Sequence, residues 1–284
     1  MKKLLFSTLF LIMLVSCILT RKETALPDTT PTLDSVAMLG SNPCVLPCWQ
    51  KITPGISTIR EMDEVTQILF GLFLPKKTDT FQNKEYVAGS IGKTFLIDGT
   101  KIYFSAGMFS ISNHELVEVL DIWADIIGHQ ETDISIGHNV YWQFFTKYSL
   151  QNILAKYGVP EKVLIFGEVY SEEWLQDRNA LHLRVLYPSK GIFVNYDMPL
   201  VKEGNIGIAC PNNADFRLWL TLPNPNQPYL ELWESAQGYT NFSRTFDTPI
   251  EEAIHLTTID FYNKFKESND ACFETPLDVW KIKP

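Results

Sequence analysis

The stretch Lys93–Phe104, Lys-Thr-Phe-Leu-Ile-Asp-Gly-Thr-Lys-Ile-Tyr-Phe, carries the clearest structural signal in the sequence. Runs of β-branched and aromatic residues flank Asp98-Gly99, a dipeptide that suits a type I′ turn because both central residues of that turn need positive φ. The stretch therefore predicts a β-hairpin. Residues 115–127 have an apolar pattern that fits a strand or a helix, and we favour a strand as far as Trp123.

A helix is predicted ahead of the strands in each half of the chain. Thr58 and Glu61 form a capping-box pattern, after which apolar residues recur at helical spacing as far as Leu69. Ser149 is the corresponding N-cap in the second half, and Gly158 stands where a left-handed residue ends a helix. Further strands are predicted at 163–166, 181–187, 192–196, 216–222 and 229–233.

The last helix is predicted to run from Thr248, its N-cap, to about Lys266, with Pro249 in the first helical position. Antiparallel hairpins dominate the sequence and strands do not alternate regularly with helices. The predicted fold class is therefore α+β, with two related helix-then-antiparallel-β-meander subdomains at 44–130 and 131–284. The apolar residues expected on the buried side of the last helix are Ile254, Ile259, Tyr262 and Phe265.

The first residues have the features of an export signal. Two lysines precede the apolar run Leu4–Val15, which is too short to span a bilayer core of about 30 Å. The following Leu14-Val15-Ser16-Cys17 resembles a bacterial lipobox, in which the cysteine is diacylglycerylated and the chain is cut just before it. We interpret residues 1–16 as a signal peptide and Cys17 as the lipidation site. An ordinary secretory signal and an uncleaved anchor are the alternatives.

The lipobox resemblance implies a lipid-anchored protein of the bacterial cell envelope with its body outside the cytoplasm. Residues 17–43, rich in Thr, Pro and Asp, predict a flexible tether, although an extension packed on the body is the alternative. The chain has 24 basic and 33 acidic residues, a net charge of −9 that becomes −11 without residues 1–16. This acidity argues against a nucleic-acid partner, and it leaves membrane attachment to the acyl chains.

Four cysteines remain once Cys17 carries lipid, and an even number outside the cytoplasm predicts disulfides. Sequence alone allows three pairings, of which we favour Cys44–Cys48 with Cys210–Cys272. The alternative for Cys44-x-x-x-Cys48 is a copper or redox function, because two thiolates at this spacing can chelate Cu(I). The surrounding sequence lacks the thioredoxin-like context of such sites, so a structural bridge is the favoured interpretation.

Candidate catalytic and metal motifs are weak. Ala88–Gly92 matches a variant nucleophile elbow, but no helix is predicted after it, so we interpret it as a glycine-rich loop. An acidic run lacks the spacing of a calcium loop and is interpreted as a solvated face; its members are Asp121, Asp125, Glu131 and Asp133. The histidines lack the spacing of a helical zinc site and are interpreted as surface or hydrogen-bonded core residues; they are His114, His129, His138, His182 and His255. We expect no cofactor and no metal.

The densest aromatic region runs from Phe216 to Phe246 and is interleaved with prolines. Aromatic residues in a β-rich domain usually fill the core, but at a surface they form a rigid platform for a protein or a sugar. For the region as a whole, we favour the interpretation that its aromatic side chains fill the core. The residues that would form a platform are Trp219, Tyr229, Trp233 and Tyr239.

Two short passages resemble known families. Pro54–Thr58 before a helix, and Tyr157–Pro160 before a strand, resemble small outer-membrane lipoproteins of the SmpA/BamE type and β-lactamase-inhibitor-like domains. That resemblance implies helices on a meander and a function in binding proteins. Pro47–Gln50 with Ile52–Gly55 resembles the start of lipoproteins from environmental bacteria, which implies no particular activity. We therefore expect a binding or protein-interaction module, with a surface hydrolase using a non-motif site as the alternative.

Replacing Cys17 with Ser removes the thiol that would carry the lipid. We expect the C17S protein to leave the membrane fraction, whereas the wild-type protein stays there and begins at an acylated Cys17. Mass spectrometry of the N-terminal peptide measures both the cleavage site and the acyl mass. A wild-type peptide that begins elsewhere, or that lacks an acyl group, would contradict the lipidation site.

Overall fold

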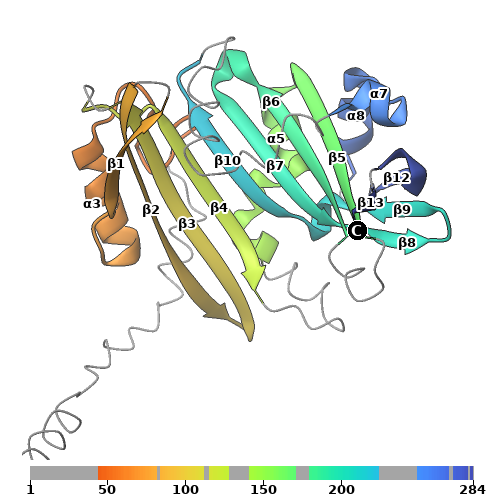
Figure 1. Ribbon diagram of the computed structural model, residues 1–284, viewed down its shortest axis with the longest axis horizontal. Coiled ribbons are helices and arrows are strands. Elements are labelled where there is room, and N and C mark those ends of the chain that lie inside the picture. Colours follow the sequence, from red (N-terminus) through yellow and green to blue (C-terminus); the bar gives the residue numbers. More distant parts are fainter. Residues whose placement is uncertain are drawn as a thin grey trace, which may run out of the picture. The chain divides into compact units, whose positions relative to one another are not determined.

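A single large sheet organises the protein in the computed structural model, which describes residues 44–81, 84–111, 115–127, 141–170, 179–223, 248–268, 271–280 and 282–283. Ten strands run in the order β1-β2-β3-β4-β10-β7-β6-β5-β11, with β13 parallel to β5 and all other pairs antiparallel (Figure 1). The strands are β1 (Lys76–Phe81), β2 (Lys84–Ile97), β3 (Thr100–Ile111), β4 (Val119–Ile127), β5 (Lys162–Tyr170), β6 (Ala180–Tyr187), β7 (Ile192–Pro199), β10 (Asp215–Thr221), β11 (Thr248–Pro249) and β13 (Ile282–Lys283). A separate small sheet has the order β12-β9-β8, from Phe273–Pro276, Ile206–Ala209 and Val201–Glu203.

The hairpin predicted around Asp98-Gly99 is confirmed as β2 and β3. Both turn residues have positive φ, 48° for Asp98 and 82° for Gly99, as a type I′ turn requires. The loop predicted at Ala88–Gly92 is wrong, because these residues lie within β2. Gly92 serves close packing instead of a turn: a Cβ there would lie 2.1 Å from the hydroxyl of Tyr103 on the neighbouring strand.

In each half of the chain, one helix is followed by a series of four strands of the large sheet, and β11 and β13 are added to the second series. Helix α3 (Ile59–Phe70) precedes β1 to β4, and α5 (Leu150–Tyr157) precedes β5, β6, β7 and β10. The last strands of the two series, β4 and β10, pair with each other, so the sheet continues across both halves. The α+β class is confirmed, whereas the division into two related subdomains stays a prediction.

The predicted helix starts are confirmed by their caps. The Thr58 hydroxyl accepts from the backbone N–H of Glu61 at 3.2 Å, and the Glu61 carboxylate accepts from the N–H of Thr58 at 2.6 Å. The Ser149 hydroxyl caps α5 by accepting from the N–H of Asn152 at 3.4 Å. Among the described helices, none is long and apolar enough to cross a membrane.

The predicted last helix is in fact two helices, α7 (Ile250–Ile254) and α8 (Thr258–Phe265). The chain turns between them at His255, whose φ is 56°, and His255 therefore lies in a turn. Thr257 then starts α8 by accepting from the backbone N–H of Asp260 at 3.2 Å. A second N-cap inside the apolar pattern is what ends the first helix.

The first residue of the predicted last helix and the set of residues buried along it also differ from the prediction. Thr248 is a strand residue of β11 opposite Ile165 rather than the N-cap, and Pro249 occupies the N-cap position. Ile259 was expected to be buried but is 48% exposed, while Phe265 is buried as predicted. The break at residue 255 shifts the phase of the second helix, which is why one continuous helical pattern misplaced Ile259.

The described helices all pack on one face of the sheet, where the main core lies; in Figure 1, α5 lies behind the sheet. The ring of Phe104 stacks on that of Phe145 with centroids 5.7 Å apart. The Tyr141 hydroxyl donates to the carbonyl of Ala124 at 3.0 Å and accepts from the N–H of Phe216 at 3.2 Å. The helical residues 141–145 are thereby fixed across the junction of β4 and β10.

The favoured disulfide pairing is confirmed, with Cys44–Cys48 and Cys210–Cys272 both formed. Cys272 lies just before β12, so the second bridge ties the C-terminal segment to the region that follows β9. The copper or redox alternative requires Cys44 and Cys48 to be reduced thiols. With these sulfurs joined, the motif offers no thiolate pair in this structure.

The two disulfides should contribute differently to stability, because the loops they close differ in length. The Cys210–Cys272 bridge spans 62 residues and Cys44–Cys48 spans 4. Chain-entropy reasoning gives about 4 kcal/mol for the long loop and about 2 kcal/mol for the short one. Urea unfolding of C210A/C272A and C44A/C48A measures both losses. A larger loss for C44A/C48A would contradict this ranking.

Candidate functional site

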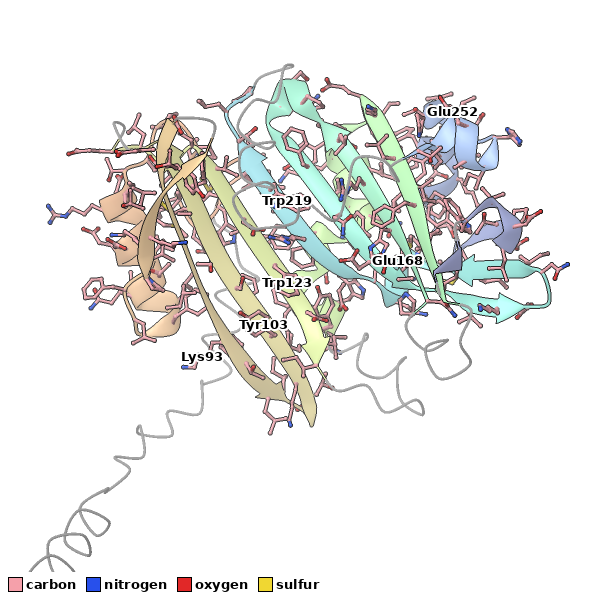
Figure 2. All side chains as sticks on the ribbon, in the orientation of Figure 1. Lys93, Tyr103, Trp123, Glu168, Trp219 and Glu252 are labelled. Carbon is pink, nitrogen blue, oxygen red and sulfur yellow. A yellow bond between two sulfur atoms is a disulfide. The ribbon has the colours of Figure 1, made fainter. Side chains whose placement is uncertain are left out.

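The face of the sheet that the described helices leave uncovered carries a dense set of aromatic and ionisable side chains. Side chains alternate between faces along a strand, so this set comes from every second residue of β3, β4, β10, β7, β6 and β5. Figure 2 shows Tyr103, Trp123 and Trp219 on this face, which is turned toward the viewer. A small apolar cluster lies on the same face and consists of Tyr86, Phe109, Val119, Leu186, Phe193 and Trp219.

A buried ion pair joins β4 to β10 on this face. The Arg217 guanidinium donates to the Asp121 carboxylate through Nε at 2.8 Å and through Nη2 at 2.5 Å. Their side chains are only 13% and 8% exposed, so the expected solvated acidic face is wrong for Asp121. The reason is register: Asp121 lies opposite Trp219 and diagonal to Arg217, which neutralises it.

Aromatic rings flank the guanidinium on both sides. The Cζ atom of Arg217 lies 5.0 Å from the ring centroid of Trp219 and 5.8 Å from that of Trp123. Tyr103 meets Trp123 edge to face, with centroids 5.5 Å apart. Trp123 and Tyr103 are half-buried, which leaves part of each ring open to a ligand.

The predicted aromatic platform is only partly described. Phe216 is buried on the helix-covered face and belongs to the core. Trp219 lies on the opposite face and is 7% exposed, and its indole N–H has no hydrogen-bond partner among the described residues. The other three residues of the predicted platform lie outside the described residues, namely Tyr229, Trp233 and Tyr239.

Next to this aromatic group, His182 on β6 pairs with Asp197 on β7. The Nδ1–H of His182 donates to Asp197, and the Asn195 amide donates to the same carboxylate oxygen at 2.6 Å. The ring of Phe166 stacks on the imidazole with centroids 4.1 Å apart. Burial works against ionisation of Asp197, but the charge and hydrogen bond of His182 and the hydrogen bond of Asn195 outweigh it and lower its pKa.

Two further carboxyl groups lie in the same row of the sheet. Asp215 on β10 is directly opposite Asp197 on β7. On the other side of β10, Asp125 of β4 lies one residue beyond the pair formed by Ala124 and Phe216. Burial raises the pKa of Asp215 well above its ordinary value, and the hydrogen bond and negative charge of Asp125 add to the rise. The backbone N–H of Ile126 also donates to Asp215, at 3.3 Å. Asp215 therefore binds its proton more tightly than Asp197 on the adjacent strand does.

This row combines a carboxyl group of raised pKa, a carboxyl group of lowered pKa and an imidazole, which can together accept and donate hydrogen bonds or move a proton. The sequence analysis missed Asp197 and Asp215. Neither residue belongs to a local motif, and they meet Asp125 and His182 only because β4, β10, β7 and β6 are neighbours. Knowledge of the strand order would have been needed to find them.

Of the remaining histidines, one lies in the part of the chain that the structure describes. His255 lies in the turn between α7 and α8, and His114, His129 and His138 lie outside the described residues. Within the described ranges, no group of three or more His, Cys, Asp or Glu side chains is arranged to hold a metal ion. Cys17, Glu131 and Asp133 also lie outside these ranges.

Comparison of the chain with protein-family models, with curated proteins and with solved structures finds no match.

Replacing Asp197 and Asp215 with Asn should have opposite effects on stability. Asp197 stabilises the fold above its unfolded-state pKa of about 3.9, and this contribution is lost as the pH falls through its lower folded-state pKa. The part-exposed D197N variant should lose about 1 kcal/mol at pH 7 and less at pH 3. D215N should gain stability over the wild type as the pH rises above about 4, because its neutral amide avoids the cost of a buried charge.

Urea unfolding of both variants at pH 3 and pH 7 measures these differences. Each variant is the control for the other, since both change Asp to Asn on adjacent strands. Equal losses at pH 7 would contradict the opposite pKa shifts of Asp197 and Asp215.

Proposed function

We propose that this protein is a membrane-anchored extracytoplasmic lipoprotein whose body binds a protein partner through the uncovered face of its sheet. The observation that carries the proposal is the group formed by Tyr103, Trp123 and Arg217 on that face. Its rings are partly open to solvent, and its guanidinium is held in place by Asp121.

The composition of this group supports a protein partner. Trp, Tyr and Arg are the residues that most often dominate the free energy of protein–protein binding. Their side chains are held in place here, since Tyr103 packs over Gly92 and Arg217 is bound by two hydrogen bonds. A preorganised surface loses little conformational entropy when it binds. The nearby Asp197, 38% exposed, would add a polar contact at the rim.

The proposed location rests on the sequence and is supported by the disulfides. Two bridges form readily outside the cytoplasm and are uncommon within it. The lipid on Cys17 would attach the protein to the membrane, and residues 17–43 would tether the body. We further propose that the halves 44–130 and 131–284 are related subdomains, supported by the order of one helix and four strands that recurs in each.

The carboxyl row supports a second candidate, a hydrolase. The raised pKa of Asp215 beside Asp125 is what a general acid needs, and a neighbouring carboxylate could act as base or nucleophile. Turnover of chromogenic esters or glycosides that disappears in D215N would favour this candidate. Binding of a partner with no such turnover would favour the interaction module.

The binding proposal predicts that Y103A/W123A loses its partner. Truncating both rings removes the centre of the surface, and loss of a dominant aromatic contact lowers affinity about 30-fold. The measurement is chemical cross-linking of the membrane-attached protein in its native envelope, followed by isolation and mass spectrometry of the joined chains. Thermal unfolding of both proteins confirms that the variant is folded.

The matched control is L72A/F73A, which removes two exposed apolar side chains after α3, away from the proposed surface. We expect one cross-linked partner in the wild type and in L72A/F73A, and none in Y103A/W123A. A partner that cross-links equally to all three proteins would contradict the surface. The absence of any specific cross-link in the wild type would contradict the function.

A further inference from the structure

A hollow of about 510 Å³ lies on the helical side of the protein, apart from the polar sheet face. One wall is the N-terminal disulfide loop, through Cys44 and Leu46. The other wall is formed by η1 (Thr146–Tyr148) and the C-terminal half of α5. Its volume is in the range of sites that hold small organic molecules.

The charged groups of this hollow are all positive. Lys147 and Lys156 line it, and none of the described residues that line it is acidic. Neither lysine forms an ion pair within the described part of the chain. Two cations side by side stand out in a protein with a net charge of −9.

Each ammonium group is held near the wall by an aromatic ring. The Lys147 Nζ lies 5.4 Å from the ring centroid of Tyr148, and the Lys156 Nζ lies 5.8 Å from that of Tyr157. Lys147 is half-buried, and burial together with the like charge of Lys156 lowers its pKa to about 8. An anion between the two lysines would relieve this repulsion.

The rest of the lining suits an organic molecule. Leu46, Ala155, the disulfide and the two tyrosine rings provide apolar surface. Tyr148 is 1% exposed, so its ring forms part of the wall beneath the lysines.

We propose that this hollow binds a small organic oxyanion, a carboxylate or a phosphate ester, between Lys147 and Lys156. The anionic group would contact the two ammonium groups, and the organic part would lie against Leu46 and the tyrosine rings. This site is independent of the proposed protein-binding face, because its residues belong to different elements on the other side of the sheet.

The test uses benzoate and phenyl phosphate as probes, with uncharged benzamide as the matched control ligand. Binding to the intact, oxidised protein is followed by isothermal titration calorimetry at pH 7. We expect saturable binding of at least one of the two anions and none of benzamide. Binding of benzamide as tight as that of benzoate, or no saturable binding of either anion, would overturn the proposal.

The variant K147Q places the anion site on a particular residue. We expect affinity for the bound probe to fall about tenfold in K147Q and less in K156Q, since Lys156 is more exposed. The control is K190Q, because Lys190 also lies over a tyrosine ring but outside the hollow. Its Nζ is 5.7 Å from the ring centroid of Tyr187. Equal loss in K190Q, or unchanged binding in K147Q, would overturn the assignment.

A pH series tests whether the charge of Lys147 contributes to binding, because a purely structural role would leave the affinity independent of the ionisation of Lys147. Lys147, with a pKa near 8, is mostly protonated at pH 7 and mostly neutral at pH 9. An anion binds the protonated form, so affinity for whichever probe binds should fall between these two pH values in the wild type. The fall should be smaller in K147Q, and an identical fall in both proteins would contradict the role of Lys147.

Discussion

The pairing of β4 with β10 is the contact on which the rest of the structure depends. It joins two strands that are about one hundred residues apart in the chain, from Phe216 opposite Ala124 to Thr221 opposite Val119. On the helix-covered face it is reinforced by the Tyr141 hydroxyl, and on the other face by the Asp121–Arg217 ion pair. Without this pairing the strands of each half would end in an open edge, which proteins seldom leave exposed.

The same pairing creates the candidate site. Asp125 and Asp215 approach each other only because β4 and β10 are adjacent, and Asp197 follows on β7. Carboxyl groups on neighbouring strands repel one another when ionised. The row accommodates three of them because the pKa of Asp215 is raised, which favours its neutral form, while His182 and Asn195 stabilise the charge of Asp197. A neutral residue in place of Asp215 would avoid the cost of burying a charge, whereas the charge of Asp197 is stabilised by its partners.

The features that sequence predicted well are those specified by short-range chemistry. The Asp98-Gly99 turn, the capping box at Thr58 and the Ser149 cap each depend on a few consecutive residues. Side-chain partners that depend on the strand order could not be predicted from the sequence. Asp121 is an example, because Arg217, which neutralises it, is 96 residues away. Short-range reasoning also failed at His255, where Thr257 offered a competing cap inside a pattern that was helical on both sides.

The two sides of the sheet carry different ionisable groups, and the sheet backbone separates them. The uncovered face gathers carboxyl groups with their partners, whereas the hollow on the helical side gathers two lysines without acidic neighbours in its lining. A sheet keeps these groups apart, since side chains on opposite faces cannot reach one another. The Cys44–Cys48 bridge adds a local constraint, because it closes the loop that forms one wall of the hollow. That wall is thus fixed by a covalent bond within the folded body, whatever the conformation of the chain that leads to it.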